Sequence, residues 1–311
     1  MSSNSIKVFA PASVSNVGPG FDIMGFALNE PGDEVTVTKS DSNDLVITNI
    51  TGDNGKLPFE ILKNTTTFAM KSMIDFYGLP GGYNVQINKK MGIGSGLGSS
   101  AASAVAGVFA LNKLLNLRLK KKELLDFAVQ GESIASNAIH ADNVAPALYG
   151  GFVLIRGYNP IDVIKIDTPS NLFCSIIYPA IEIKTSEARK ILPKSVSIKT
   201  AVEQAGNSAG LVTGLMQNDF NLISRSLIDS IAEPRRAKLL PFYEEVRKSA
   251  LASGALNCNI TGSGPSIFAF SLSKNNAVEI AVNMKKTISD FGVEGQTYVS
   301  KINKVGPKVL D

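Results

Sequence analysis

The stretch Gly92-Ile-Gly-Ser-Gly-Leu-Gly-Ser-Ser100 decides the fold of this chain. It follows a segment of alternating apolar and polar residues, YNVQIN at 83–88, which predicts a strand. It precedes a helix predicted at about 99–116, whose apolar residues recur at intervals of four and three. Glycine at every second position lets backbone N–H groups surround an anion, and the helix start adds free donors and the positive end of its dipole. A phosphate group fits such a loop best.

Two familiar nucleotide-binding motifs do not fit this loop. A Walker A loop requires a lysine after its second glycine, and no lysine lies between 91 and 112. A dinucleotide-binding GxGxxG loop requires glycine where Leu97 or Ser99 stands. The serine hydroxyls of the loop add donors, and one at the helix start could bind Mg²⁺. A flexible glycine turn that leads into a helix remains the alternative for this segment taken alone.

The composition is that of a globular protein large enough for two domains. Of its 311 residues, 44% are hydrophobic and 19% are charged, which excludes the disordered and fibrous classes. Because the chain has one histidine and two cysteines, it cannot form a Cys/His zinc site, and any metal must be a hard ion held by oxygen. The net charge of +4 is too small and scattered for a nucleic-acid footprint, but it suits a small anionic ligand.

Several features predict a chain that works in the cytoplasm. Cys174 and Cys258 each lie in an apolar run, so we expect core residues in a reducing compartment rather than a disulfide. The first residues, MSSNSIKVFAPASVS, lack the apolar core of a signal peptide. The uncharged stretch 91–112 has too few apolar residues to span a bilayer, since glycines fill its first third. We therefore expect neither a membrane nor a nucleic acid as partner.

The order of predicted elements indicates an α+β fold in two domains, with a boundary near residue 168. Two helices, at 99–116 and about 121–139, interrupt the strands of the first domain, and the second helix carries a line of small residues. The strands of this domain are predicted at 6–10, 34–38, 45–50, 83–88, 151–156 and 161–166. The second domain is predicted to have strands at 172–178, 256–260, 266–272 and 296–300, with helices across 186–252 and at 275–291. That order is typical of a ferredoxin-like layer.

Two further loops are as rich in Gly, Pro, Ser and Asn as the glycine loop. The first, APASVSNVGPGFD at 10–22, follows a strand, and its Asn16 and Asp22 could equally be ordinary turn formers. The second, NITGSGPS at 259–266, lies between two apolar strands, where a tight hairpin is the alternative. Three such loops in a chain of two domains predict a shared site.

A few charged side chains are candidates for chemistry. Glu132 lies next to the small-residue line of its helix, where a carboxylate is costly unless it is paired, protonated or metal-bound; a surface position is the alternative. A lone histidine such as His140 is more often structural. Arg189 and one of the pair Arg235 and Arg236 could clamp a carboxylate or phosphate if the fold brings them together, and otherwise are surface residues.

Taken together, the three loops resemble those of the GHMP family of small-molecule kinases. PASVSNVGPGFD at 11–22, MGIGSGLGSSAAS at 91–103 and NITGSGPS at 259–266 carry this resemblance, and GSGLGSS is its most specific part. Gly92 departs from the family, which usually has proline there. The resemblance implies an N-terminal βα domain with the phosphate loop (1–168), a C-terminal ferredoxin-like domain (169–311), ATP and Mg²⁺ as cofactors, and a homodimer.

Four shorter segments are most similar to the homoserine kinase branch of that family. They are GFD at 20–22, HADNVAP at 140–146, TSEAR at 185–189 and EPRRAKLLP at 233–241. The last of these resembles an EPxRxxLLP run, which assigns the functional arginine to Arg236. This similarity implies that ATP phosphorylates the side-chain hydroxyl of L-homoserine, a step of threonine biosynthesis.

The resemblance assigns roles residue by residue. Asp22 is implied to bind the homoserine amino group, Arg189 and Arg236 its carboxylate, and Asn16 and His140 its hydroxyl end. Ser100 and Glu132 are implied to hold Mg²⁺. Contacts with ATP are implied for Asn64, Gly92, Ile93, Gly94, Ser95, Gly96, Leu97, Gly98, Ser99, Ser100, Ala101, Ala102 and Thr185.

The residue at 143 predicts the mechanism. The mevalonate and galactose branches of the family have an aspartate near the reacting hydroxyl, and the comparable residue here is Asn143. An amide accepts no proton at neutral pH, so Asn16, His140 and Asn143 are expected to position the hydroxyl without a strong general base. This mechanism predicts a flat pH dependence of turnover around neutrality. A GHMP kinase with another alcohol as acceptor, and a non-catalytic ATP-binding sensor, remain the alternatives.

Overall fold

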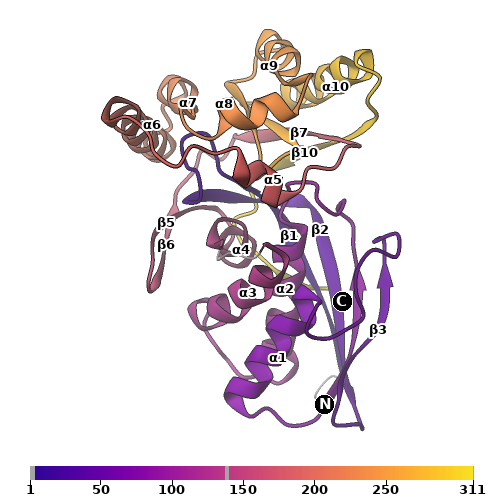
Figure 1. The fold of residues 1–311 in the computed structure, drawn as a ribbon. Coiled ribbons are helices and arrows are strands. Elements are labelled where there is room, and N and C mark those ends of the chain that lie inside the picture. The colour runs from indigo at the N-terminus through magenta and orange to yellow at the C-terminus, as the bar shows by residue number, and fades with distance from the viewer. Residues whose placement is uncertain (1–3, 137–139, 311) are drawn as a thin grey trace.

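The protein contains two β-sheets joined by a common core, each with helices packed on it (Figure 1). The structure, a computed structural model, describes residues 4–136 and 140–310. None of the helices in these ranges combines the length and the apolar character that crossing a membrane requires. Both domains have the mixed helix and sheet content that the sequence predicts.

The first sheet has seven strands in the order β11-β1-β2-β4-β3, with β5 paired to β2 and β6 to β5. Its pairs are antiparallel except for β3 and β4, which run parallel because a helix, α1 (Thr65–Tyr77), connects them. Its strands are β1 (Ser5–Ser15), β2 (Met24–Ser40), β3 (Leu45–Thr51), β4 (Gly82–Asn88), β5 (Phe152–Tyr158), β6 (Ile161–Ile166) and β11 (Lys308–Leu310).

Four helices cover one face of this sheet: α1, α2 (Ser99–Leu114), α3 (Lys121–Ser136) and α4 (Ala141–Tyr149) (Figure 1). Helix α2 lies at the centre of the layer and is buried along most of its length, which its alanines and valines permit. The small-residue line of α3 allows close packing, since a Cβ on Gly131 would lie 2.5 Å from the carbonyl oxygen of Thr65 and 2.7 Å from Cβ of Ala69. This packing places the start of α2 at the edge of the domain.

The second sheet has the strand order β10-β7-β9-β8 and confirms the ferredoxin-like prediction. Its strands are β7 (Phe173–Pro179), β8 (Asn257–Ile260), β9 (Ile267–Ser271) and β10 (Gly295–Lys301). Helices α9 (Tyr243–Ala252) and α10 (Lys274–Asp290) pack beside it (Figure 1). Between β7 and α9 the chain forms α5 (Thr185–Lys190), α6 (Ile198–Gln217), α7 (Phe220–Ser226), α8 (Glu233–Arg236) and the 3₁₀ turn η1 (Ala237–Leu239).

Aromatic side chains join the two sheets. Phe26 of β2 lies 5.9 Å from Phe152 of β5, and 5.1 Å and 5.9 Å from Phe270 and Phe268 of β9, measured between ring centroids. Cys174, which is buried and free, belongs to the same core, and so the second sheet is buried on both faces. The domains therefore share a packed interface, and a site between them has rigid walls.

The structure differs from the sequence prediction in a few elements. Helices α1 and α4 and strand β11 were not predicted, and the loop predicted at 10–22 begins only at Asn16, because β1 continues to Ser15 along β2. The last residues of the helix predicted at 121–139, namely 137–139, lie outside the described residues. The segment 167–172, between the two sheets, contains the predicted boundary at 168, which stays a prediction; β11 returns the chain to the first sheet.

Candidate active site

A cavity of about 320 Å³ lies between the domains, where the glycine loop, the starts of α2 and α4, and helices α5 and α8 meet. The two other loops predicted to share a site contribute Asn16, Asp22, Gly262 and Ser263 to its wall. Gly92, Leu97, Ala101 and Ala102 are not part of its lining. The predicted site residues that line it are Asn16, Asp22, Asn64, Ile93, Gly94, Ser95, Gly96, Gly98, Ser99, Ser100, Glu132, His140, Asn143, Thr185, Arg189 and Arg236.

The glycine loop has the backbone of an anion site. Gly94, Gly96 and Gly98 are all left-handed, with φ of 71°, 77° and 66°. A Cβ on Gly96 would lie 2.8 Å from the carbonyl oxygen of Gly264, and one on Gly98 would lie 2.2 Å from Ser13 Oγ. Glycine is therefore required both by the conformation and by the close packing, and the alternating left-handed turns aim N–H groups into a concavity.

Helix α2 points its free amides at this concavity. Its N-cap, Gly98, has no side chain to satisfy them, and the amides of 98–101 have no acceptor within the helix. The amide of Ala102 donates to the carbonyl of Gly98 at 2.8 Å, so the predicted contact of Ala102 with ATP cannot come from its amide. Leu97 and Ala101 have buried side chains that fix the loop to the core.

Gly92 packs against the ring of Tyr178. A Cβ on Gly92 would lie 2.4 Å from Cε1 of Tyr178. A proline, which is the usual residue of the family at this position, would therefore require the Tyr178 ring to move.

Lys89 and Asp33 bond to the start of α2 and hold the end of the glycine loop in place, and sequence reasoning missed both. The ammonium of Lys89 pairs with the Asp33 carboxylate and donates to the carbonyl oxygen of Ser99 at 2.9 Å and to Ser103 Oγ at 2.6 Å. Asp33 also accepts from the hydroxyls of Ser99 and Ser103, at 2.9 Å and 3.1 Å. The pair is buried, and it fixes the first turn of α2 from the end of β4. The doubled lysine that directly follows strand β4, Lys89-Lys90, was the available clue.

Ser100 and Glu132 lie together at the cavity, on α2 and α3. The Ser100 hydroxyl interacts with the Glu132 carboxyl group and favours its ionised form, which lowers its pKa. Burial raises the pKa of Glu132 to about 7, and the negative charge of Asp142 adds to the effect. A hydroxyl and a buried carboxylate at a helix start are the hard oxygen donors that Mg²⁺ prefers, so this pair fits the ion that the resemblance implies.

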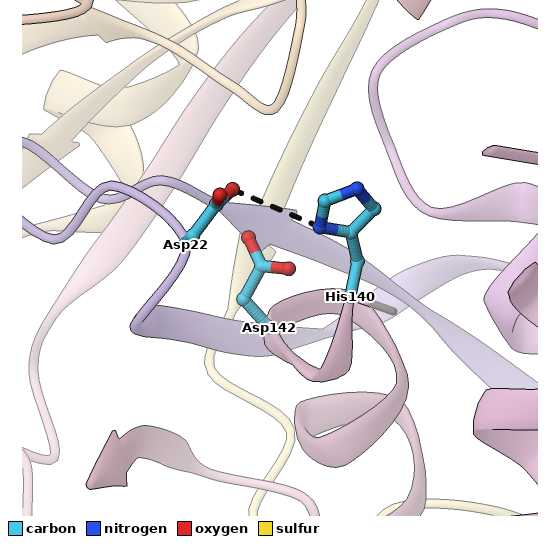
Figure 2. A group of neighbouring side chains, drawn as sticks. All are labelled: Asp22, His140 and Asp142. Atoms are coloured by element: carbon cyan, nitrogen blue, oxygen red, sulfur yellow. Dashed lines mark ion pairs between the residues drawn. The ribbon is translucent and has the colours of Figure 1, made fainter. Parts of the chain in front are cut away.

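Asp22 is the centre of a charged cluster at the other end of the cavity. One Arg189 nitrogen donates to both Asp22 oxygens, at 2.8 Å and 3.0 Å, and lies 3.1 Å from Nδ1 of His140. Figure 2 shows Nδ1 of His140 facing the Asp22 carboxylate, at 3.8 Å. Burial and the charge of Arg189 lower the pKa of His140, so the imidazole is neutral at neutral pH. Its Nε2 is buried and has no hydrogen-bond partner among the described residues.

Arg236, rather than Arg235, lies in the cavity. Arg236 on α8 is buried and donates to the carbonyl of Gly262, whereas Arg235 is exposed and lines a separate surface depression near the start of α6. The guanidinium carbons of Arg236 and Arg189 lie 5.1 Å and 5.7 Å from the centroid of the Phe21 ring. Within the described part of the chain, Nε of each cavity arginine is buried without a hydrogen-bond partner. Two guanidinium groups with unused donors therefore face one space.

Asp142 is a second buried carboxylate in the cluster, and sequence reasoning did not single it out. One carboxylate oxygen of Asp142, one of Asp22 and one ring nitrogen of His140 all lie within 4.8 Å of one another (Figure 2). This is the spacing of a possible metal site. Arg189 already binds both oxygens of Asp22, so an added metal ion would compete with a guanidinium. Burial raises the pKa of Asp142 to about 7, and the charge of Asp22 contributes. The cluster suits an ammonium group better than a metal ion.

The side chains of Asn16 and Asn143 line the cavity and also bond to other parts of the protein. Oδ1 of Asn16 accepts from the Asp22 amide at 2.7 Å, and Oδ1 of Asn143 accepts from the Ser13 hydroxyl at 2.9 Å. These bonds leave the side-chain N–H groups of both asparagines for a ligand. Thr185 begins α5 beside the third loop.

Asn64 uses its side chain as a cap. Its Oδ1 accepts from the Thr66 amide at 3.1 Å and its Nδ2 donates to the carbonyl of Pro58 at 3.0 Å. The adenine contacts predicted for Asn64 and Thr185 stay predictions.

Two family models match the chain. The model of the GHMP kinases N terminal domain matches residues 63–151, and the model of the GHMP kinases C terminal domain matches residues 211–290. The chain is 44% identical to a homoserine kinase of Chlorobium phaeobacteroides over 97% of this chain and 98% of that one. It is 35% identical to a homoserine kinase of Pyrococcus abyssi, over 96% and 97% of the two chains.

Solved structures share the fold. A homoserine kinase of Cytophaga hutchinsonii superimposes with a TM-score of 0.97 at 50% identity, covering 100% of this chain and 98% of that one. A mevalonate kinase of L. major in complex with R-mevalonate has a TM-score of 0.74 at 15% identity, over 97% and 99% of the chains, a likeness of fold alone. The chain has the two sheets and the glycine loop, and homoserine kinases match it over nearly its full length at 35–50% identity. It therefore belongs to the GHMP kinase family, among the homoserine kinases.

Proposed function

We propose that this chain transfers the γ-phosphoryl group of ATP to the side-chain hydroxyl of L-homoserine, giving O-phospho-L-homoserine and ADP. The convergence of Asp22, Arg189 and Arg236 on the cavity that also holds the glycine loop carries this proposal. A kinase for a sugar or a simple alcohol has no need of an acid and two arginines at the acceptor end. An α-amino acid needs both, since it presents an ammonium beside a carboxylate.

The Asp22–Arg189 pair is the complement of that zwitterion. Arg189 holds the Asp22 carboxylate in place, and Asp142 lies beside it, so the ammonium meets one carboxylate and a second carboxyl group that can ionise on binding. The unused Nε donors of Arg189 and Arg236 can take the substrate carboxylate in charge-assisted hydrogen bonds. Binding both charged groups fixes the rotation of the substrate and leaves its side chain to extend toward the glycine loop.

The phosphate end of the site works by electrostatic stabilisation. The left-handed glycines and the start of α2 surround the ATP phosphates with amides, and the Lys89–Asp33 ion pair holds the helix start in place. Ser100 and Glu132 would hold Mg²⁺, which when bound neutralises charge on the phosphates. These groups are in place before the reaction, so little reorganisation is needed at the transition state.

No side chain is assigned as a strong base. Asn143 does not titrate, and its carbonyl oxygen is already used by Ser13, so its N–H group positions the acceptor hydroxyl or the transferred phosphoryl group. His140 is neutral, and its Nε2 can hold the hydroxyl. The hydroxyl oxygen attacks phosphorus in line as the bond to ADP breaks, and the proton leaves late, to the transferred phosphate.

An ADP-release assay tests this proposal. The protein is given MgATP alone and then with L-homoserine, D-homoserine, mevalonate or galactose. We expect stimulation by L-homoserine only. Stimulation by mevalonate or galactose would indicate a different GHMP kinase, and no stimulation by any acceptor would indicate a nucleotide sensor. A homodimer and a cytoplasmic location stay predictions.

A further inference from the structure

Tyr158, the last residue of β5, touches two segments of the acceptor site at once. Its hydroxyl donates to the carbonyl oxygen of Asp22 at 2.6 Å. The same oxygen accepts from the amide of Ala141 at 3.4 Å. One side chain therefore links the loop that ends at Asp22 with the start of α4.

The Asp22 backbone needs such a link. Asp22 has a left-handed φ of 57°, a conformation that residues with a Cβ adopt rarely. Two hydrogen bonds hold it there from opposite sides: the side chain of Asn16 accepts from its amide at 2.7 Å, and Tyr158 donates to its carbonyl. The direction of the Asp22 carboxylate, and with it the position of Arg189, depends on this backbone conformation.

The start of α4 needs it as well. His140 is the N-cap of α4, and its side chain makes no capping hydrogen bond. The first amides of a helix have no acceptor within the helix, so the Tyr158 hydroxyl supplies an acceptor that the N-cap does not. Ala141 lies between His140 and Asp142 in the sequence, and both of these residues face Asp22 (Figure 2). The bond to Tyr158 therefore fixes the backbone that carries them.

The hydroxyl is suited to both bonds because it stays protonated. Burial raises the pKa of Tyr158, and the negative charges of Asp142 and Asp22 raise it further. A protonated phenol donates one hydrogen bond and accepts another, which is the combination that the Asp22 carbonyl and the Ala141 amide require.

We propose that Tyr158 is a positioning residue of the acceptor site: its hydroxyl sets the spacing between Asp22 and the start of α4, and through it the affinity for the ammonium group of an amino-acid acceptor. This inference rests on the function proposed above. It assigns Tyr158 no contact with the reacting atoms. Removal of the hydroxyl should therefore weaken acceptor binding and leave the phosphoryl transfer step and ATP binding in place.

The test compares Tyr158→Phe with Tyr149→Phe. Tyr149 ends α4 and is not part of the cavity lining, so it controls for the loss of a tyrosine hydroxyl near the same helix. In Tyr158→Phe we expect the KM for L-homoserine to rise about 10-fold, a change that corresponds to the loss of a typical hydrogen bond. The kcat at saturating homoserine and the KM for ATP should match the wild type, and Tyr149→Phe should match it in all three constants.

A double-mutant cycle separates positioning from simple destabilisation. If Tyr158 acts on the ammonium through Asp22, then Tyr158→Phe added to Asp22→Asn should raise the homoserine KM by clearly less than it does alone. Full additivity of the two changes would overturn the inference. Thermal unfolding of each variant fixes an assay temperature well below all midpoints. A lower midpoint for Tyr158→Phe with an unchanged homoserine KM would mean that the hydroxyl only stabilises the fold.

The outcomes also separate this inference from the function on which it rests. Turnover of L-homoserine by the wild type, with equal homoserine KM in Tyr158→Phe, would refute the positioning role alone. No turnover of L-homoserine by the wild type would refute the proposed function, and the role of Tyr158 would fall with it.

Discussion

Replacement of Arg236 by leucine tests the acceptor site most directly. Arg236 is 4% exposed, lines the cavity, donates to the Gly262 carbonyl and has a buried Nε without a hydrogen-bond partner among the described residues. Its neighbour Arg235 carries the same charge one residue away but is exposed and outside the cavity. The two substitutions Arg236→Leu and Arg235→Leu therefore change the net charge equally and differ only in what the guanidinium faces.

The structure sets the magnitude of the effect. Without Arg236, the substrate carboxylate keeps one guanidinium, that of Arg189, which also holds Asp22. Removing one partner of a desolvated, hydrogen-bonded charge pair costs about 2–4 kcal/mol, which corresponds to a rise in KM of about 30-fold to 1,000-fold. Arg236→Lys keeps the charge without the planar fork and should fall between the leucine variant and the wild type.

The assay measures ADP release, first with homoserine varied at saturating MgATP and then with MgATP varied at saturating homoserine. We expect a large rise in the homoserine KM for Arg236→Leu, an unchanged ATP KM, and wild-type constants for Arg235→Leu. Equal homoserine KM values in the two leucine variants would refute the carboxylate clamp. A rise in both KM values for Arg236→Leu would instead indicate a collapsed cavity, which its unfolding midpoint would reveal.

Three further results are expected. Gly98→Ala should raise the ATP KM at least 10-fold, because a left-handed alanine costs about 1–2 kcal/mol and its Cβ would approach Ser13 Oγ to 2.2 Å. Gly206→Ala is the control and should leave the ATP KM unchanged, since no atom lies within 4 Å of the new Cβ. Asp142→Asn should stabilise the free protein at pH 8, measured by urea unfolding. Folding raises the pKa of Asp142 from 3.8 to about 7, so the folded state favours the protonated form. The contribution of Asp142 to the free energy of unfolding is therefore fully present below pH 3.8 and is lost as the pH rises through 7. The gain is bounded by about 4 kcal/mol from this shift and should be near zero at pH 3.5. The kcat at saturation should be flat around neutral pH, since Asn143 does not titrate, His140 is already neutral, and saturating MgATP and homoserine would keep Glu132 and Asp142 ionised.

Each of these expectations has a result that would contradict it. An unchanged ATP KM in Gly98→Ala would separate the loop from phosphate binding. A stability difference between Asp142→Asn and the wild type that does not grow with pH would show that Asp142 is not a buried acid. A limb of kcat near pH 6 to 7 that disappears in His140→Leu would identify a general base and refute the proposed mechanism.

The sequence alone predicted the parts of the site that depend on local geometry. A glycine at every second position before an apolar helix favours backbone that turns left-handed and packs closely, and φ is positive at Gly94, Gly96 and Gly98. The alternation of strands and helices likewise predicted the ferredoxin-like sheet, since each strand has to bury an apolar face. The resemblance of three loops to one family then supplied roles that no single residue could reveal.

Elements with weak local patterns were missed. Helix α1 begins with three threonines, whose branched side chains lower helix propensity, and α4 is short and contains Pro146. Strand β11 has three residues and is a strand only because β1 offers it an edge. In each case the element forms because a neighbour buries it, which a linear pattern does not record.

Only the tertiary structure decided which charges meet. Composition and spacing alone do not distinguish Arg235 from Arg236, which only the family resemblance separated, and they give Asp142 no special role. In the fold, α8 buries one arginine and exposes the other, and α4 brings Asp142 and His140 to within reach of Asp22. Asp33 and Tyr158, which lie in strands, bond to groups in loops and helices far from them in the chain. Composition and spacing determine local backbone conformation, whereas the energy of a buried charge depends on groups that only the packed sheets bring together.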